Sequence, residues 1–357
     1  MNLYAVILAG GRGERFWPQS RVECPKQFLS LFGGRPLIRQ AAERLGDLAP
    51  ADRTYVITSA NLVGLTRETL PEVPAGNIIG EPVGRDTAPA VALACGLIRA
   101  RDPEATVCVF PADALIGDVE GFRRTVGAAA LRASGSRSIL TIGIPPSYPA
   151  TGYGYVEAGA VVSEEPVRIR GVVRFVEKPC VQTAERYLEA GGYLWNAGIF
   201  IWHVRTMSEA LARHAPEAAA LAEAVSKTPA DRLDGVLSRL YPQTPKISID
   251  YAVMEKASNI EVADAAFYWD DVGSWTALPA HFPQDGAGNT VVGDLEALDA
   301  EGNIVLSRGR LTALVGVRDL VVVHAGNATL VCPKERVSEI KKLLSRIAER
   351  PDASAYL

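Results

Sequence analysis

The sequence lacks the features of several large classes of protein. No apolar run within its 357 residues approaches the ~20 residues needed to span a bilayer. The N-terminus has neither a basic region nor a small-residue cleavage site. The formal net charge is only −4, which gives no electrostatic reason to expect nucleic acid or an anionic membrane as a partner. We therefore expect no membrane segment, no signal peptide and no nucleic-acid partner.

Metal-binding and redox residues are few and scattered. The four histidines lie far apart, and the five cysteines form no Cys-x-x-Cys pair. This spacing argues against a zinc site or a disulfide framework and fits a reducing, cytoplasmic compartment. No Ser, Cys or His constellation for covalent catalysis is evident either.

The N-terminal stretch carries the clearest pattern. Ala5–Ala9 is apolar without polar alternation, as in a strand that is buried on both faces of a parallel sheet. Three glycines and three cations follow. Glycines let backbone N–H groups face a ligand, and the cations add positive charge, so the segment predicts a polyphosphate site. These residues are Gly10, Gly11, Gly13, Arg12, Arg15 and Lys26.

Two common phosphate-binding loops do not fit this stretch. A Walker A loop requires glycine followed by lysine and then serine or threonine, and the segment has no such triplet. A dinucleotide fingerprint would use Gly11 and Gly13, but Phe16 stands at its third glycine position and Pro18 interrupts the helix. A nicotinamide-dependent oxidoreductase is therefore excluded by spacing.

Strand-like and helix-like segments alternate over the first half of the chain. This order predicts an α/β fold with a doubly wound, mostly parallel, Rossmann-like sheet. Ligands of such sheets bind beyond the carboxyl ends of the strands. Three loops follow predicted strands and are expected to share one crevice: Gly10–Arg15, Glu81–Pro89 and Pro111–Asp113.

The composition changes after Pro283. Short β-rich runs separated by glycines extend from Gly288 to Cys332, and helical periodicity returns at Lys334–Arg350. We predict a large α/β domain over residues 1–282 and a small β-rich, β-helix-like domain with a terminal helix over 283–357. Apolar strands in this second domain offer a surface for self-association, so we expect a homodimer.

Six segments together resemble one family, the sugar-nucleotide pyrophosphorylases, and within it the mannose-1-phosphate guanylyltransferases. Any one of them is a weak signal alone, but they occur in the family's order. Residues 1–282 would then form the nucleotidyltransferase catalytic domain. Besides the first segment, Gly10–Pro18 with Pro25-Lys26, the segments are Glu81–Arg85, Phe175–Pro179, Leu194–Gly198, Ser248–Lys256 and Asp271–Trp275.

The resemblance implies a reaction. Such enzymes transfer GMP from GTP to mannose 1-phosphate and release pyrophosphate, with GDP-mannose as the product, by direct in-line attack of the sugar phosphate. Two anions must approach each other, so cations and a divalent metal are required. Asp113 and Asp271 match the family's two metal-binding aspartates, which implies Mg²⁺ as cofactor. Asp270 beside Asp271 leaves a small ambiguity.

The resemblance also assigns the remaining site residues. Arg15 and Lys26 would contact the triphosphate, and Lys178 the phosphate of the sugar; we class these three as catalytic. Sugar hydroxyls would meet Glu177, Asn196 and the backbone of Gly154. A carboxylate at Glu81 can accept hydrogen bonds from guanine N1–H and N2–H₂. The predicted nucleotide-binding set is Leu8, Ala9, Gly10, Gly11, Gly13, Glu81, Pro82, Arg85 and Asp113.

Some positions depart from the family's pattern. Ala114 stands where histidine is usual, and Asp86 where asparagine is frequent. Two alternatives therefore stay open: the same chemistry with another sugar 1-phosphate or nucleotide, such as a glucose or heptose substrate, or a catalytically silent regulator that binds nucleotide sugars. The chain ends near residue 357, without the isomerase domain of some longer relatives, so we expect a monofunctional enzyme.

Overall fold

The computed structural model describes residues 2–357, and they form two compact units. Unit 1 contains residues 2–10 and 40–270. Unit 2 contains residues 11–39 and 271–357. The predicted boundary between residues 282 and 283 follows composition, whereas these units follow the packing of the chain, so that boundary stays a prediction.

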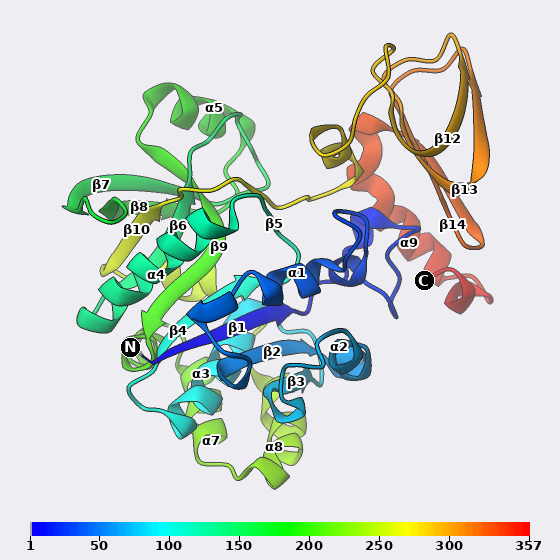
Figure 1. The fold of residues 1–357 in the computed structure, drawn as a ribbon. Helices are drawn as coiled ribbons and strands as arrows, with labels where there is room; N and C mark the ends of the chain where they lie inside the picture. The colour runs from blue at the N-terminus through cyan, green and yellow to red at the C-terminus, as the bar shows by residue number, and fades with distance from the viewer. Residues whose placement is uncertain (1) are drawn as a thin grey trace. The chain divides into compact units, whose positions relative to one another are not determined.

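Unit 1 is built on a nine-stranded sheet with helices on both faces (Figure 1). The strand order is β3-β2-β1-β4-β9-β6-β10-β8-β7. The first four strands are parallel neighbours, as the alternation of strands and helices predicts. Their bounds are β1 Leu3–Ala9, β2 Thr54–Ser59, β3 Ile78–Glu81 and β4 Thr106–Pro111.

The core explains why these segments are strands and helices. β1 is almost wholly buried, in keeping with its unbroken apolar run. Val107 and Val109 of β4 belong to the same core cluster as α3 (Thr87–Arg101), whose alanines and leucines are buried on nearly every side. Phe110 instead contacts Phe122 of α4 (Val119–Gly135) at a ring distance of 5.7 Å. Side chains of alternate β4 residues therefore pack against helices on opposite faces of the sheet.

The other half of the sheet is mixed. β9 runs antiparallel to both β4 and β6, and β6 is parallel to β10. β7 and β8 are an antiparallel pair at the edge. Sequence periodicity does not report strand direction, and these antiparallel pairings were not predicted. The strands are β6 Ile139–Ile144, β7 Tyr155–Ser163, β8 Ile169–Val176, β9 Tyr193–His203 and β10 Ile260–Asp264.

The remaining helices of unit 1 surround this sheet. A two-stranded ribbon pairs β5 (Leu115–Ile116) with β11 (Trp269–Asp270). α1 spans Leu37–Glu43, and its residues are divided between the two units after Arg39. The other helices are α2 Val63–Thr69, α5 Val181–Ala190, α6 Val204–His214, α7 Pro216–Ser226 and α8 Leu233–Leu240.

Unit 2 joins the glycine-rich segment to the C-terminal part of the chain. Phe16 packs on Trp275, with ring centroids 4.9 Å apart, and the Trp275 indole donates a hydrogen bond to the Trp17 carbonyl at 3.0 Å. The Trp17 indole donates in turn to the Tyr356 carbonyl at 2.8 Å. Phe16, Trp17 and Trp275 are buried, so they anchor residues 11–39 within this unit.

A four-stranded sheet forms the β-rich part of unit 2. β12 (Thr290–Leu298), β13 (Ile304–Val315) and β14 (Leu320–Ala325) are parallel neighbours, and β15 (Ala328–Pro333) closes the sheet antiparallel to β14. The predicted terminal helix is present as a 3₁₀ segment, Lys334–Glu339, continued by α9, Ile340–Ala348.

Two glycine-asparagine pairs have a definite role in this sheet. Gly288 and Gly302 have φ of +75° and +63°, a conformation that glycine adopts without the steric penalty of a Cβ. Asn289 and Asn303 are fully buried, and the Asn303 amide donates to the Asn289 side-chain oxygen at 3.0 Å. This link between equivalent turns holds successive coils together, in agreement with the predicted β-helix-like domain.

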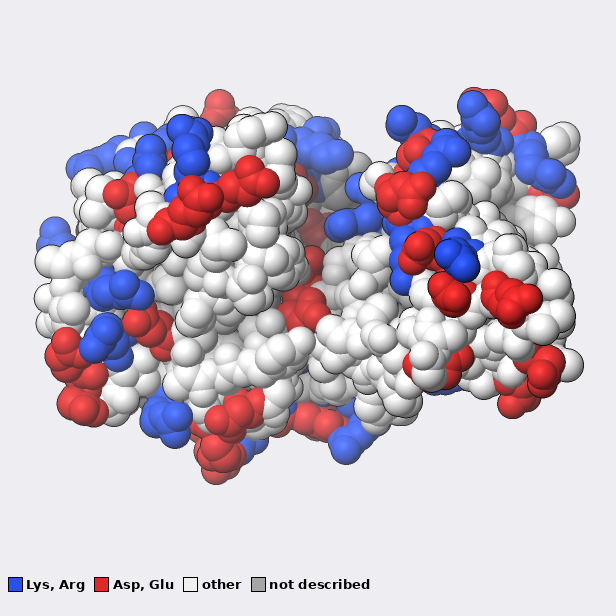
Figure 2. All heavy atoms as spheres, turned by 90° about the horizontal axis from the view of Figure 1, so that it is seen from above, with Lys and Arg blue, Asp and Glu red and all other residues white. Residues whose placement is uncertain are grey.

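The molecular surface carries charged side chains of both signs, in keeping with the small formal net charge of −4 (Figure 2). Figure 2 shows Lys and Arg side chains interspersed with Asp and Glu side chains on the face that it presents. Among the helices of residues 2–357, none combines the length and the apolar character required to cross a bilayer.

Candidate functional site

In unit 2, Gly13 lies directly against Lys26. Gly13 has φ of +61°, and a Cβ at this position would stand 2.2 Å from the Lys26 Cβ and 2.9 Å from its backbone nitrogen. Only glycine fits this approach. Lys26 itself is 5% exposed, so its ammonium group is held in a defined place rather than free in solvent.

Unit 2 also brings Arg15 and Asp271 toward Lys26. The Lys26 ammonium donates to the Asp271 carbonyl at 2.6 Å. A Cβ placed on Gly273 would be 3.2 Å from Asp271 Oδ2 and 3.5 Å from Arg15 Nη1, so both side chains flank this glycine. Three of the predicted residues therefore gather here: two cations that can bind phosphate oxygens and one carboxylate that can bind a metal.

The backbone beside Asp271 is strained. Val272 is fully buried and has φ of +45°, a conformation that β-branched residues rarely adopt. Lys178 and Asp86, in two other predicted site segments, also have positive φ, at +47° and +66°. Strain of this kind costs roughly 1–3 kcal/mol per residue and concentrates at functional sites.

In unit 1, Glu81 ends β3 and is buried at the predicted nucleotide loop. The Tyr241 hydroxyl donates a hydrogen bond to Glu81 Oε1, while Oε2 would lie 2.7 Å from a Cβ placed on Gly10. Burial raises the pKa of Glu81 to about 7, although the Tyr241 hydroxyl acts in the opposite direction. The Arg85 guanidinium donates to the Pro242 carbonyl, so the segment Tyr241–Gln243 holds this loop at both ends.

The predicted sugar-binding residues also gather within unit 1. A Cβ on Gly154 would stand 2.5 Å from Glu177 Oε2, and the Asn196 N–H donates to the Gly154 carbonyl at 2.8 Å. Lys178 forms an ion pair with Glu177 Oε1. Burial alone would lower the pKa of Lys178, but Glu177 and the carboxylate of Asp250 raise it. The ammonium group is exposed and charged, as a phosphate ligand requires.

Asp113 follows β4 in unit 1. The Ala112 N–H donates to the Leu8 carbonyl at 3.0 Å, which ties this turn to the end of β1. Arg44 is buried and donates to the Ala114 carbonyl at 2.8 Å. Burial lowers the pKa of Arg44 to about 10, and the nearby Asp113 carboxylate opposes this shift. The turn that carries Asp113 is therefore fixed from two sides.

Three residues around these groups were not predicted: Arg44, Tyr241 and Asp250. Asp250 stood inside a recognised segment, but its type alone gave it no role. Tyr241 and Arg44 had no local signal, because each acts across a long separation in sequence: Tyr241 on Glu81 and Arg44 on Ala114.

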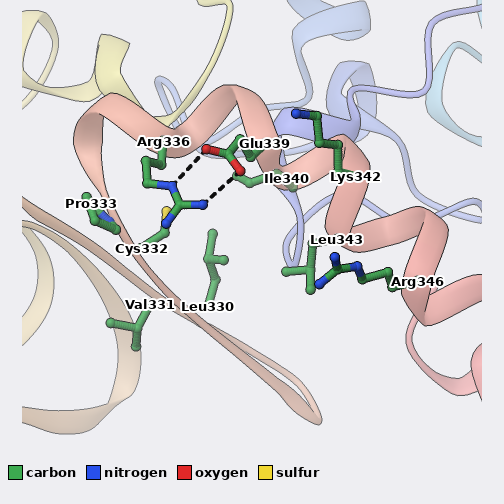
Figure 3. Close-up of a pocket in the computed structure, with 10 residues that line it drawn as sticks. All are labelled: Leu330, Val331, Cys332, Pro333, Arg336, Glu339, Ile340, Lys342, Leu343 and Arg346. Carbon is green, nitrogen blue, oxygen red and sulfur yellow. Dashed lines mark hydrogen bonds and ion pairs between the residues drawn. The ribbon is translucent and has the colours of Figure 1, made fainter.

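Two cavities of unit 2 contain none of the site residues that the family resemblance assigns, although Arg12 of the glycine-rich segment lines one of them. The larger has a volume of about 340 Å³ and lies between β15 and α9, where Arg336 and Glu339 form an ion pair of 2.7 Å (Figure 3). The second, of about 280 Å³, is lined by Arg12, Glu14 and Lys341 among others. Within residues 2–357, no three His, Cys, Asp or Glu side chains are grouped as a self-sufficient metal site.

Comparison with known proteins identifies the family. A family model for nucleotidyl transferases matches residues 4–286, and one for the MannoseP isomerase/GMP-like β-helix domain matches residues 293–347. The mannose-1-phosphate guanylyltransferase of Sinorhizobium fredii strain NGR234 is 36% identical over 97% of this chain and 68% of its own length. The chain belongs to the mannose-1-phosphate guanylyltransferase family.

Two further relatives are similar to this chain over nearly its whole length. The mannose-1-phosphate guanylyltransferase of Escherichia coli K12 is 36% identical over 97% of this chain and 73% of its own length. The solved structure of the mannose-1-phosphate geranyltransferase from Thermus thermophilus is 37% identical, with a TM-score of 0.86 over 98% of this chain and all of that one. The predicted family, fold class and enzyme class are confirmed, and family members of this kind generally use a divalent metal.

Proposed function

We propose that this chain transfers GMP from GTP to α-D-mannose 1-phosphate, giving GDP-mannose and pyrophosphate. The observation that supports it most is the identity of 32–37% to mannose-1-phosphate guanylyltransferases over nearly the whole chain. The grouping of Glu177, Lys178, Asn196 and Gly154 in unit 1 is consistent with a site for a sugar phosphate.

The reaction balances without a covalent enzyme intermediate. An oxygen of the sugar phosphate attacks the α-phosphorus of GTP, and the bond from that phosphorus to the β-phosphate oxygen breaks. Pyrophosphate leaves with the electron pair. In this proposal Lys178 binds the attacking phosphate, while Arg15 and Lys26 bind the triphosphate. Catalysis is then positioning and charge neutralisation.

We assign the metal to Asp113 and Asp271. Mg²⁺ is bound by one or two carboxylates together with phosphate oxygens and water, so a site of three protein ligands is not needed. Both side chains are partly exposed carboxylates at the ends of strands, which suits this donor set. When bound, the metal would withdraw charge from the α-phosphate.

The assay that tests the proposal is a panel of nucleoside triphosphates against sugar 1-phosphates, with release of pyrophosphate as the readout. GTP with mannose 1-phosphate is expected to give the highest kcat/KM. Turnover of another pair in its place would favour a different substrate for the same chemistry. Absence of turnover throughout the panel would favour a silent nucleotide-sugar-binding protein.

A homodimer also belongs to this proposal. Leu298, Leu311, Val315 and Val331 are 59–67% exposed on the β12–β15 sheet of unit 2, so this sheet offers apolar side chains for association. The expected cytoplasmic location stays a prediction. Analytical ultracentrifugation of the wild type beside Leu311→Lys would test the association surface.

Gly154→Ala is expected to weaken binding of the sugar phosphate. The new methyl group would lie 2.5 Å from Glu177 Oε2 and would push that carboxylate out of place. Loss of a hydrogen bond to a charged group corresponds to an increase of about 10- to 100-fold in the KM for mannose 1-phosphate. The matched control is Gly152→Ala, since no atom of unit 1 lies within 4 Å of the added methyl. An unchanged KM in Gly154→Ala would contradict the assignment of Glu177.

Binding of GTP is expected to weaken as the pH falls through about 7. Burial raises the pKa of Glu81 to about 7, and only the ionised carboxylate can accept from both guanine donors. The KM for GTP should therefore be lowest above pH ~8 and rise toward pH ~6, on either side of that pKa. Glu81→Gln removes the titrating group and should flatten this part of the profile. An identical profile in Glu81→Gln would show that another group titrates.

A further inference from the structure

Asp250 occupies a special place beside the proposed sugar site. It is the first residue of a π-helical turn, Asp250–Met254, in which the Glu255 N–H donates to the Asp250 carbonyl at 2.9 Å. Single π-turns are rare and occur frequently at functional sites. The residue as a whole is of intermediate exposure, and its carboxylate is largely desolvated.

One oxygen of Asp250 orients Asn196. The Asn196 Nδ2 donates to Asp250 Oδ1 at 3.1 Å. The other end of this amide is fixed as well, because Asn196 Oδ1 accepts from the Thr141 hydroxyl at 2.7 Å and from the Gly198 N–H at 3.2 Å. An amide nitrogen carries two hydrogens. Asn196 therefore keeps one donor for a ligand, in a direction set by Asp250.

Besides the Asn196 amide, the backbone N–H of Asp250 itself donates to the Asp250 carboxylate, which leaves part of its capacity of about four acceptor positions for a ligand. In the described part of unit 1, Asn196 is the only side chain of another residue that donates a hydrogen bond to this carboxylate. Charges from two segments face it: Glu177 and Lys178 after β8, and Asp86 before α3. Burial, together with Glu177, raises the pKa of Asp250 to about 7, while Lys178 opposes the shift. A largely desolvated carboxylate with an unused acceptor is costly unless a ligand supplies a donor.

The far end of the same turn holds the other sugar-site residue. Glu255 Oε1 accepts from the backbone N–H of Glu177 at 3.2 Å. The turn from Asp250 to Glu255 thus positions Asn196 at its start and Glu177 at its end. A segment that serves only the core would not need polar contacts to both of these residues.

We propose that Asp250 is a further sugar-binding residue: one carboxylate oxygen orients the Asn196 amide, and the other accepts a hydrogen bond from a hydroxyl group of the bound sugar 1-phosphate. This inference rests on the proposed function, since it concerns the sugar subsite of that reaction. The ligand class is a hexose phosphate with a free hydroxyl directed toward the π-turn.

Kinetics of Asp250→Ala and Asp250→Asn test the assignment. Asp250→Ala removes both acceptors and is expected to raise the KM for mannose 1-phosphate about 10- to 100-fold, with the KM for GTP within about twofold of the wild type. Asp250→Asn keeps one oxygen for the Asn196 amide and should show a smaller increase. Lys256→Ala, an exposed change at the end of the same turn, is the matched control and should leave both KM values unchanged.

Deoxy analogues of the sugar 1-phosphate identify the hydroxyl. Removing the hydroxyl that Asp250 binds should weaken the wild type but should have little further effect in Asp250→Ala, because the two changes delete the same interaction. If the effect of removing each hydroxyl and the effect of Asp250→Ala were fully additive for every hydroxyl, the proposed contact between Asp250 and the sugar would be overturned. A KM for mannose 1-phosphate in Asp250→Ala equal to that of the wild type would overturn the whole inference, and so would an equal rise in the KM for GTP.

The substrate panel tests the proposed function independently of the Asp250 variants. If the wild type turns over another sugar 1-phosphate in the panel, the same variants are compared with that substrate. If it turns over none, equilibrium binding of mannose 1-phosphate to the wild type and to Asp250→Asn replaces the kinetics, with weaker binding to the variant expected. Thermal unfolding of each variant shows whether it folds, and Asp250→Asn, which keeps the shape of the side chain, serves if Asp250→Ala does not.

Discussion

Asp271→Asn is expected to lower kcat about 10³-fold at saturating substrates. The change keeps the shape of the side chain but removes the charge that we assign to the metal. Metal stabilisation of a transferring phosphate is worth several kcal/mol, and each ~1.36 kcal/mol changes the rate about tenfold. The Lys26 contact should survive, because Lys26 donates to the Asp271 backbone carbonyl rather than to its side chain. The rate of pyrophosphate release over a range of Mg²⁺ concentrations is the measurement.

Asp270→Asn is the matched control for this prediction. Asp270 is the neighbouring residue, but it lies in β11 and pairs with Leu115 of β5. It should keep most of the activity, whereas Asp113→Asn should resemble Asp271→Asn. If Asp270→Asn lost most of its activity while Asp271→Asn stayed active, the metal would be assigned to Asp270 in place of Asp271. Metal-dependent activity in both Asp113→Asn and Asp271→Asn would contradict the assignment altogether.

Gly13→Ala is expected to abolish most activity and to destabilise the protein. An alanine at φ of +61° costs roughly 1–2 kcal/mol, and its methyl would overlap Lys26, whose Cβ is 2.2 Å away. Relief of that overlap must displace Lys26, since the contact is with its backbone and Cβ rather than with a flexible chain end. We expect kcat/KM to fall about 100-fold, equivalent to a lost charged hydrogen bond. Steady-state kinetics and the melting temperature report the two effects.

Gly11→Ala distinguishes a loss of activity caused by strain in the protein from one caused by blocking the approach of the triphosphate. No atom of unit 2 lies within 4 Å of the methyl that it adds, and Gly11 does not have a positive φ. Its melting temperature should equal that of the wild type. Loss of activity in this stable variant would mean that the bound triphosphate occupies the space in front of Gly11. A stable and fully active Gly13→Ala would contradict the role given to the contact between Gly13 and Lys26.

Local chemistry explains why much of the site could be predicted from the sequence. The apolar run before Gly10 becomes β1 because its side chains have to be buried on both faces of the sheet. Arg15, Lys26 and Asp271 were selected by type and order, and unit 2 brings them together. Their roles toward GTP and the metal stay predictions.

Other features required the folded chain. The antiparallel strand β9 between β4 and β6 could not be predicted, because burial on both faces looks the same in either direction. Residues 11–39 pack with the C-terminal residues through Phe16, Trp17 and Trp275. Composition changes at a different point in the chain and carries no information on such long-range packing.

The sequence by itself determined the family, the α/β fold and the residue types of the site, since these depend on local spacing and on the order of motifs. Only the tertiary structure decided which other side chains form hydrogen bonds with the predicted site residues. Tyr241 is 160 residues from Glu81, and Asp250 is 54 residues from Asn196, yet each pair shares a hydrogen bond. Hydrogen bonds of this kind depend on distances below about 3.5 Å between folded segments, and no pattern along the chain encodes them.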